Sequence, residues 1–161
     1  MGLGRTTRFA PLPAGARRVS VMRAGAGGVK ALAPSVELLT EFQRRKRALV
    51  KAGTPSEAAH AEAHRTMGYR ERYLDEIRAR PEALAALRAL VTEARTDDVY
   101  LMCMCAYRTR ERACHTYALL DLARELDPRL RLLPEPAPRG AGGQTVSDSP
   151  RRRRDCPDGK V

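Results

Sequence analysis

Residues 98–104 have the sequence DVYLMCM, and this stretch decides the fold. Its residues are β-branched or apolar almost throughout, which is typical of a strand that is buried on both faces of a parallel sheet. Parallel strands are joined by long crossover connections, usually helices. We therefore expect helices on both sides of this stretch in the sequence.

Helix signals do flank it. Ser35 is placed to cap a helix that ends near Gly53. The sequence TPSE at 54–57 is a capping box with Pro at the first helical position, and it begins an Ala-rich helix. A third helix is expected over 69–80, and Pro81 begins a fourth. After the strand, an apolar stripe predicts a last helix that Asp127-Pro128 ends, with its members at Leu119, Leu122, Ala123 and Leu126.

Two further strands are expected, over 17–23 (RRVSVMR) and, as a short final strand, over 130–133. The order of elements predicts an α/β fold in which a short, mostly parallel sheet is flanked by helices. Residues 1–16 are predicted to be an irregular lead-in, 17–133 a single domain, and 134–161 a disordered basic tail that includes an isolated Cys156.

Charge is distributed unevenly along the 161 residues, whose formal net charge is +11. Residues 1–30 contain five Arg, one Lys and no acid, whereas 31–133 contain 18 basic and 15 acidic residues. Nucleic-acid binding through the basic ends therefore stays open as an alternative. No apolar run is long enough to cross a membrane. Four Cys without a secretory leader indicate a reducing compartment, and we expect the cytoplasm.

The glycine-rich loop 24–28 (AGAGG) follows the predicted strand 17–23. A phosphate-binding turn is one interpretation. Its spacing matches neither the dinucleotide-binding fingerprint nor the P-loop, and Lys30 is not followed by Ser or Thr. A flexible connector is therefore favoured.

The chemistry of the chain is concentrated in 101–116. Cys103 and Cys105 are two apart at the end of a strand, so both side chains leave the same face. Cys114 and His115 begin the following helix, and the end of a parallel strand and the start of the next helix lie at the same sheet edge, where ligands bind. The loop between them, 106–113, carries three cations, Arg108, Arg110 and Arg112.

Three interpretations of this cluster remain open. Cys103, Cys105, Cys114 and His115 are suitable ligands for one zinc ion, although the spacing between the first two is shorter than in zinc knuckles. Alternatively, Cys114 is a reactive thiol, activated by a helix N-terminus and His115, and the Arg side chains hold an anionic group of a ligand, or the same groups form a non-covalent anion-binding site. In the third interpretation, the cysteines only fill space in the core.

The remaining histidines, His60 and His64, lie four residues apart on the Ala-rich helix. Such a pair can bind a metal, but the Glu that follows the first His in metalloproteases is missing. The sequence favours ordinary surface histidines.

Five blocks of the chain resemble a family grouped as domain-of-unknown-function family 488. They are LAPSVELL at 32–39, YRERYL at 69–74, PEAL at 81–84, VYLMC at 99–103, and Cys114-His115. The match covers residues 17–133, and its most specific part is the apolar strand that ends in Cys, followed by Cys-His at a helix start. The resemblance implies an α/β domain with a site at the sheet edge.

The resemblance also implies that Arg23 is equivalent to the family's Arg at the end of the first strand. Two features depart from the family pattern: the aromatic and Pro residues after that Arg are replaced by the Ala/Gly loop, and Thr116 stands where an Arg often follows Cys-His. The leading hypothesis is an enzyme-like site for a phosphate-bearing or nucleotide-type ligand. Cys105, Cys114 and His115 would supply its chemistry, and the anion would be held by Arg23, Arg108, Arg110 and Arg112. The alternatives are a zinc-stabilised binding module and a nucleic-acid-associated accessory protein.

Overall fold

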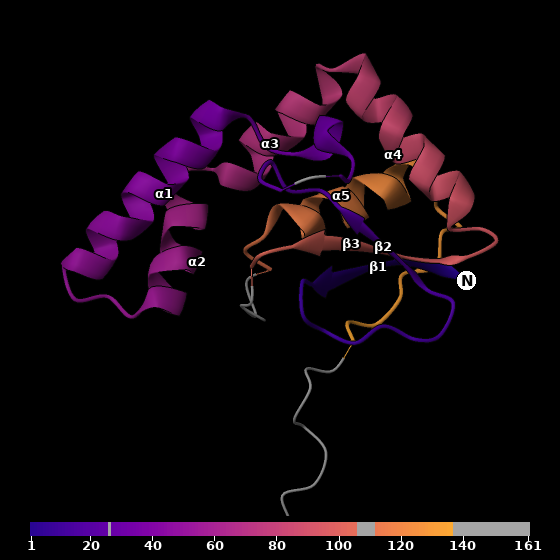
Figure 1. The fold of residues 1–161 in the computed structure, drawn as a ribbon. Helices are drawn as coiled ribbons and strands as arrows, with labels where there is room; N and C mark the ends of the chain where they lie inside the picture. The colour runs from indigo at the N-terminus through magenta and orange to yellow at the C-terminus, as the bar shows by residue number, and fades with distance from the viewer. Residues whose placement is uncertain (26, 106–111, 137–161) are drawn as a thin grey trace, which may run out of the picture.

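The computed structural model describes residues 1–25, 27–105 and 112–136. Its elements follow the order β1 (Gly2–Thr7), β2 (Arg17–Ser20), the 3-10 helix η1 (Lys30–Leu32), α1 (Val36–Lys51), α2 (Ser56–Thr66), α3 (Tyr69–Arg78), α4 (Pro81–Glu93), β3 (Asp98–Cys103) and α5 (His115–Leu126) (Figure 1). The predicted α/β class is confirmed. Residues 137–161, predicted to belong to a disordered basic tail, lie outside the described residues.

The three strands form one parallel sheet in the order β1-β3-β2. The predicted buried strand β3 is therefore central, and Val99 and Leu101 are fully buried. Thr7 is paired with Cys103 and Ser20 with Met102, so the three strands end at one edge. The arrowheads point toward α1 and α2, which therefore lie beyond the carboxyl ends of the strands (Figure 1).

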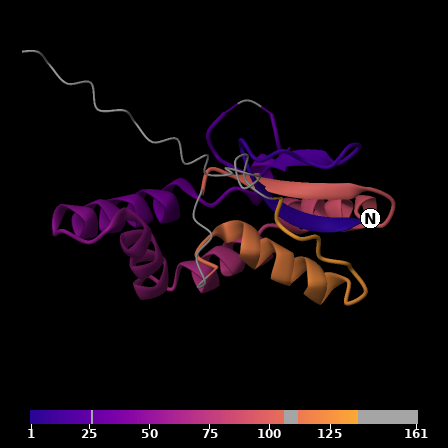
Figure 2. The ribbon, with the colours of Figure 1, turned by 90° about the horizontal axis from the view of Figure 1, so that it is seen from below.

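Helices α3, α4 and α5 contact one another, and α5 also lies against β1 and β3 (Figure 2). Leu119 of α5, Tyr73 of α3 and Leu87 of α4 are fully buried in the same core as Leu101. The Tyr73 hydroxyl donates to the Leu32 carbonyl at 2.5 Å, so the polar end of this large side chain is satisfied. This core holds β3 and the start of α5 in fixed positions.

The prediction of an irregular lead-in over 1–16 is wrong for Gly2–Thr7, which forms β1. The sequence hides this strand because two of its residues are glycines, which are rare in strands. A Cβ on Gly2 would lie 2.5 Å from the Arg131 carbonyl oxygen, and one on Gly4 would lie 2.7 Å from the Tyr100 ring. Glycine is thus needed because neighbouring groups approach the backbone closely.

The short final strand expected over 130–133 is reduced to one bridge, in which Leu132 pairs with Leu3 of β1. Leu3 donates to Arg131 at 3.0 Å and accepts from Leu133 at 2.9 Å, both through the backbone. This pairing brings the segment that follows α5 alongside β1, and it places Glu135 near the edge where the strands end.

The predicted helix boundaries are largely confirmed. Ser35 caps α1, because its Oγ accepts from the Leu38 amide at 3.0 Å. Pro81 is the first residue of α4, as predicted. The helix predicted from the capping box at 54–57 begins one residue later than expected, because Pro55 occupies the N-cap position and Ser56 is the first residue of α2. No helix in the described part of the chain is long and apolar enough to cross a membrane.

Lys30 organises the glycine-rich loop. Its Nζ donates to the carbonyl oxygens of Met22, Arg23 and Gly25 at 3.1, 2.9 and 2.6 Å. A phosphate-binding turn presents N–H groups to its ligand, whereas here the carbonyls converge on a side chain of the protein itself. The contacts are those of a connector.

Candidate functional site

A cavity of about 430 Å³ lies at the edge where the strands end. It is bounded by the loop after β2, by α1, α2 and α3, and by the residues between β3 and α5. The lining residues are Met22, Arg23, Ala24, Pro34, Leu39, Phe42, Gln43, Lys46, His60, His64, Tyr69, Cys103, Met104, Cys105, Ala113, Cys114 and His115. This volume lies within the range of about 300–1,000 Å³ that is typical of small-molecule sites.

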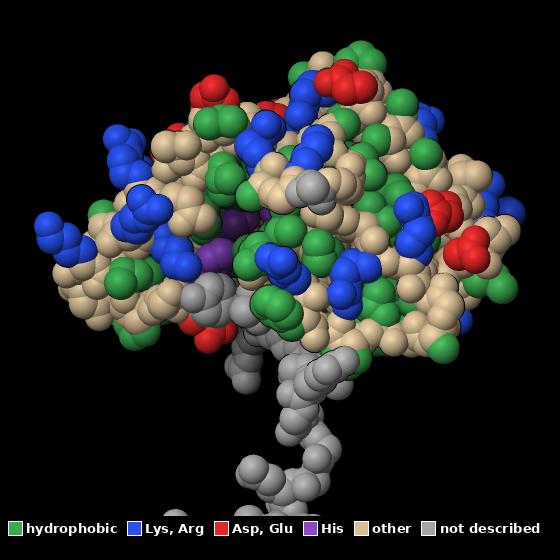
Figure 3. Space-filling view, in the orientation of Figure 1, with side chains coloured by type: hydrophobic (Ala, Val, Ile, Leu, Met, Phe, Trp, Pro, Cys, Tyr) green, Lys and Arg blue, Asp and Glu red, His purple; other side chains and the backbone are tan. Residues whose placement is uncertain are grey.

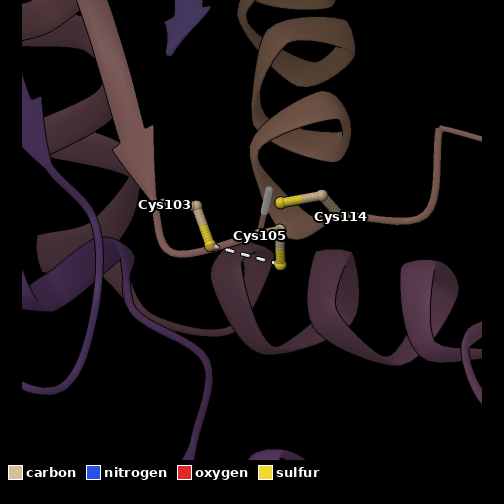
Figure 4. A group of neighbouring side chains, drawn as sticks. All are labelled: Cys103, Cys105 and Cys114. Carbon is tan, nitrogen blue, oxygen red and sulfur yellow. Dashed lines mark hydrogen bonds between the residues drawn. The ribbon is translucent and has the colours of Figure 1, made fainter. Parts of the chain in front are cut away.

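Three cysteines of the wall lie together, as the sequence predicted. The Sγ atoms of Cys103, Cys105 and Cys114 are all within 4.8 Å of one another, and the first two are 3.5 Å apart (Figure 4). Cys103 ends β3, Cys105 follows it by two residues, and Cys114 is the N-cap of α5. The sheet edge therefore brings together side chains from a strand end and a helix start.

His115 is buried beside the thiols and held in one orientation. Its Nε2 donates to the Val21 carbonyl at 3.2 Å, so its Nδ1 faces Cys103 Sγ, at 3.8 Å. The hydrogen bond to a backbone carbonyl fixes the ring and leaves Nδ1 to exchange a proton with the sulfur atoms.

Arg5 of β1 lies behind the cluster and is 1 % exposed. Its guanidinium donates to Thr116 Oγ1 at 3.1 Å, to the Cys105 carbonyl at 2.7 Å and to Glu135 at 2.8 Å. Thr116 Oγ1 is in turn 3.1 Å from Cys114 Sγ. Because the Thr116 oxygen accepts from Arg5, its proton is available to the Cys114 sulfur. Sequence reasoning missed Arg5, since nothing marked 2–7 as a strand.

The cluster favours one negative charge, on Cys114. Hydrogen bonds from Cys103 and Cys105, with the charge of His115, hold the pKa of Cys114 well below its usual range although burial opposes this. Hydrogen bonds to Cys103 and Cys114, together with burial, raise the pKa of Cys105, which therefore remains a thiol. Burial alone would lower the pKa of His115, but the neighbouring Cys103 and Cys114 raise it above its usual range. The two opposite shifts favour a protonated His115 beside a deprotonated Cys114.

The same sulfur atoms form a ligand set for a metal. Three thiolates are soft donors that suit zinc or Cu(I), and their mutual distances allow one ion to contact all three. His115 is not part of the mutually close group found among the described residues, so the four-ligand set proposed from the sequence is reduced to three cysteines.

The sequence matches the family described as the Active DUF488-N3 subclade, DUF488-N3a, over residues 12–126. The chain belongs to the DUF488 family. No curated protein and no solved structure matches it. The matched region contains the three clustered cysteines and His115, whereas Arg5 and Glu135 lie outside it. In this DUF488 protein, Arg5, which precedes the matched region, therefore contacts both the thiol cluster, at the Cys105 carbonyl, and Glu135, which follows the matched region.

The predicted anion-binding residues of this DUF488 protein fall in different places. Arg23 lines the thiol cavity, and its Nε donates to the Pro34 carbonyl at 2.7 Å. Arg112 instead forms an ion pair with Asp121 at 2.9 Å and lines a second cavity, of about 480 Å³. Arg108 and Arg110 lie outside the described residues. Lys46 of α1, which the sequence analysis did not consider, also lines the thiol cavity.

The prediction that His60 and His64 are ordinary surface histidines is wrong. His60 is buried, and its Nε2 donates to the Ala113 carbonyl at 2.7 Å. His64 lines the thiol cavity, and its ring lies 4.7 Å from that of Tyr69. Helix α1 covers this side of α2, and an Ala-rich helix has no apolar stripe that would reveal the covered face.

Proposed function

We propose that the protein is an enzyme in which Cys114 is the nucleophile and His115 carries its proton, with a phosphate-bearing ligand held in the 430 Å³ cavity. The observation that supports this most strongly is that the three clustered cysteines and the oriented His115 ring lie together on the wall of that cavity. A structural core cysteine would need neither the oriented His115 nor the Arg5–Thr116 contact behind it.

The residues suggest a two-step transfer. The Cys114 thiolate attacks an electrophilic centre of the ligand, the bond to the leaving group breaks, and the leaving group takes the proton from His115. Water then attacks the ligand centre that is bonded to sulfur and gives a proton to His115; the bond to sulfur breaks, which releases the hydroxylated product and restores the Cys114 thiolate. Lys46 and Arg23 line the cavity from two different elements and would attract an anionic group of the ligand.

The first prediction concerns the reactivity of Cys114. At pH 7 iodoacetamide is expected to modify Cys114 at least about tenfold faster than it modifies N-acetylcysteine amide, because the thiolate is already formed. Mass spectrometry of timed samples identifies the modified residue. The fast phase should disappear in C114S and persist in C105S. Modification at the rate of the free thiol, or a fast phase that survives C114S, would overturn the assignment of the nucleophile.

A metal centre is the second candidate function, and the mutual proximity of the three Sγ atoms favours it. Three thiolates would hold zinc or Cu(I) and leave one position open for a ligand in the cavity. The metal would then occupy the sulfur atoms that the first proposal requires to be free.

Elemental analysis of the purified full chain separates the two candidates. The thiol enzyme predicts less than about 0.2 equivalents of any transition metal, whereas a metal centre predicts close to one equivalent. In the second case the ion should leave when C103S, C105S or C114S is introduced, and thiol modification should be slow until a chelator is added. A bound ion that survives all three substitutions would contradict a site at this cluster.

A further inference from the structure

The second half of α1 carries an unbalanced positive charge. Five of the nine residues 43–51 are basic and none is acidic. Basic residues near a helix C-terminus are favoured by the helix dipole, but that effect is confined to the last turn, and Arg44 and Arg47 precede it. Arg44, Arg47 and Lys51 are exposed and form no ion pair with the described residues. These three exposed side chains are therefore accessible to an external anion.

Two faces of α1 have separate roles. Leu39, Phe42, Gln43 and Lys46 line the thiol cavity, at spacings that place them on one helix face. Arg44, Arg47 and Lys51, spaced three and four residues apart, share a neighbouring face over about 10 Å of helix. Figure 3 shows Lys and Arg side chains over the α1 region beside a hollow in which His side chains are visible. A row of exposed cations therefore lies on the same helix that lines the cavity.

Part of the cavity wall is aromatic, and it includes an unsatisfied polar atom. The Phe42 and Tyr69 rings are 5.1 Å apart, and the Tyr69 and His64 rings are 4.7 Å apart. His64 Nε2 is buried and has no hydrogen-bond partner among the described residues. Burial lowers the pKa of His64 to about 4, so the ring is neutral at pH 7. A neutral nitrogen beside aromatic rings suits the polar edge of a flat heterocycle.

We infer that the substrate is a single-stranded nucleic acid, whose phosphates lie along Arg44, Arg47 and Lys51 while one unstacked base occupies the thiol cavity. This inference rests on the proposed function, because the base is the part of the strand that Cys114 would reach. A single strand is favoured over a duplex, since a paired base enters a pocket only after it has been unpaired and unstacked, which costs free energy. Sequence-tolerant contacts of this kind combine a basic track with base stacking.

Fluorescence anisotropy with a labelled 12-nucleotide oligothymidylate tests the basic track. In the full chain, R44E/R47E/K51E is expected to raise Kd at least about tenfold at 100 mM salt and to reduce the salt slope by about 2, at roughly 0.7 per phosphate. The control variant R88E/R124E/R129E changes the net charge equally, at exposed positions outside α1, and should change Kd less than threefold. Equal losses in both variants, or tighter binding of a duplex than of the single strand, would overturn the inference.

Protection of the thiols tests the position of the base. Saturating oligothymidylate should slow iodoacetamide modification of the cysteine cluster at least about fivefold, whereas an abasic oligonucleotide of equal length should give less than half of that protection. H64F should weaken binding of oligothymidylate but not of the abasic strand, and this readout does not depend on a reactive thiol. Equal binding of the two strands by the wild-type chain, or protection by a mononucleotide as strong as by the oligonucleotide, would contradict the inference. A slow Cys114 with intact, base-dependent binding would instead overturn only the proposed nucleophile.

Discussion

Replacement of Arg5 with Met is expected to lower the free energy of unfolding by about 3 kcal/mol, because it leaves a buried charge network without its cation. Three acceptors lose their donor: the Glu135 carboxylate, the Cys105 carbonyl and Thr116 Oγ1. The Met side chain retains much of the apolar volume, so cavity formation adds little. Glu135 is 25 % exposed and can recover some solvation, which keeps the loss at the lower end of the range for broken buried pairs. Urea denaturation followed by far-UV circular dichroism measures the change.

Three further variants distinguish this network from simple packing. R5K retains the charge but cannot reach three acceptors, so its loss should be intermediate. E135Q in the R5M background should recover part of the stability, because it removes the negative charge that loses its Arg5 partner in R5M. R88M, at an exposed position on α4, should change the stability by less than about 0.5 kcal/mol. Equal losses in R5K and R5M, with no recovery in the double variant, would show that the hydrogen bonds contribute little.

The elements that the sequence predicted well are those whose burial leaves a pattern in the chain. Strand β3 is apolar along its whole length, and its period of two placed Cys103 and Cys105 on one face. The rule that strand ends and helix starts share an edge then brought Cys114 to the same place. These inferences needed only local periodicity and parallel pairing.

What the sequence could not predict depends on contacts between distant segments. Strand β1 contains Gly2 and Gly4 because Arg131, in the segment after α5, and Tyr100, in β3, approach its backbone. The position of Arg5 beside the site could therefore not be predicted, because residues 2–7 do not have the sequence pattern of a strand. His64 is a comparable case, because α1 covers it and nothing within α2 indicates so. For Arg112 the sequence indicated its place in the loop but not the direction of its side chain, which pairs with Asp121 and lines the second cavity.

The substitution H115Q is expected to slow modification of Cys114 by iodoacetamide at pH 6 by about ten- to a hundredfold, because the thiol loses the cation that stabilises its thiolate. Glutamine can still donate to the Val21 carbonyl, as His115 Nε2 does, so the local fold should be retained. The measurement is the modification rate between pH 5 and 9.5. In the wild-type chain the rate should stay nearly constant from pH 8.5 down to pH 7, whereas in H115Q it should fall tenfold per pH unit below an ordinary thiol pKa of about 8.5.

The effect of H115Q on the pH profile follows from the pKa shifts of Cys114 and His115. The lowered pKa of Cys114 contributes stability that is present above the usual thiol pKa and is lost as pH falls through the lowered value. The raised pKa of His115 contributes stability that is complete below about 6.5 and is lost as pH rises through the raised value. The imidazolium–thiolate pair therefore persists between the two shifted values, and H115Q removes its cationic half. H60Q is the matched control, because His60 is also buried and donates to a backbone carbonyl, but burial lowers its pKa, whereas the pKa of His115 is raised. An unchanged pH profile in H115Q would mean that the Cys114 thiolate is stabilised by Arg5, Thr116 and the α5 N-terminus without His115. An equal shift in H60Q would mean that the effect of H115Q is not specific to its cation, and it would also contradict the prediction.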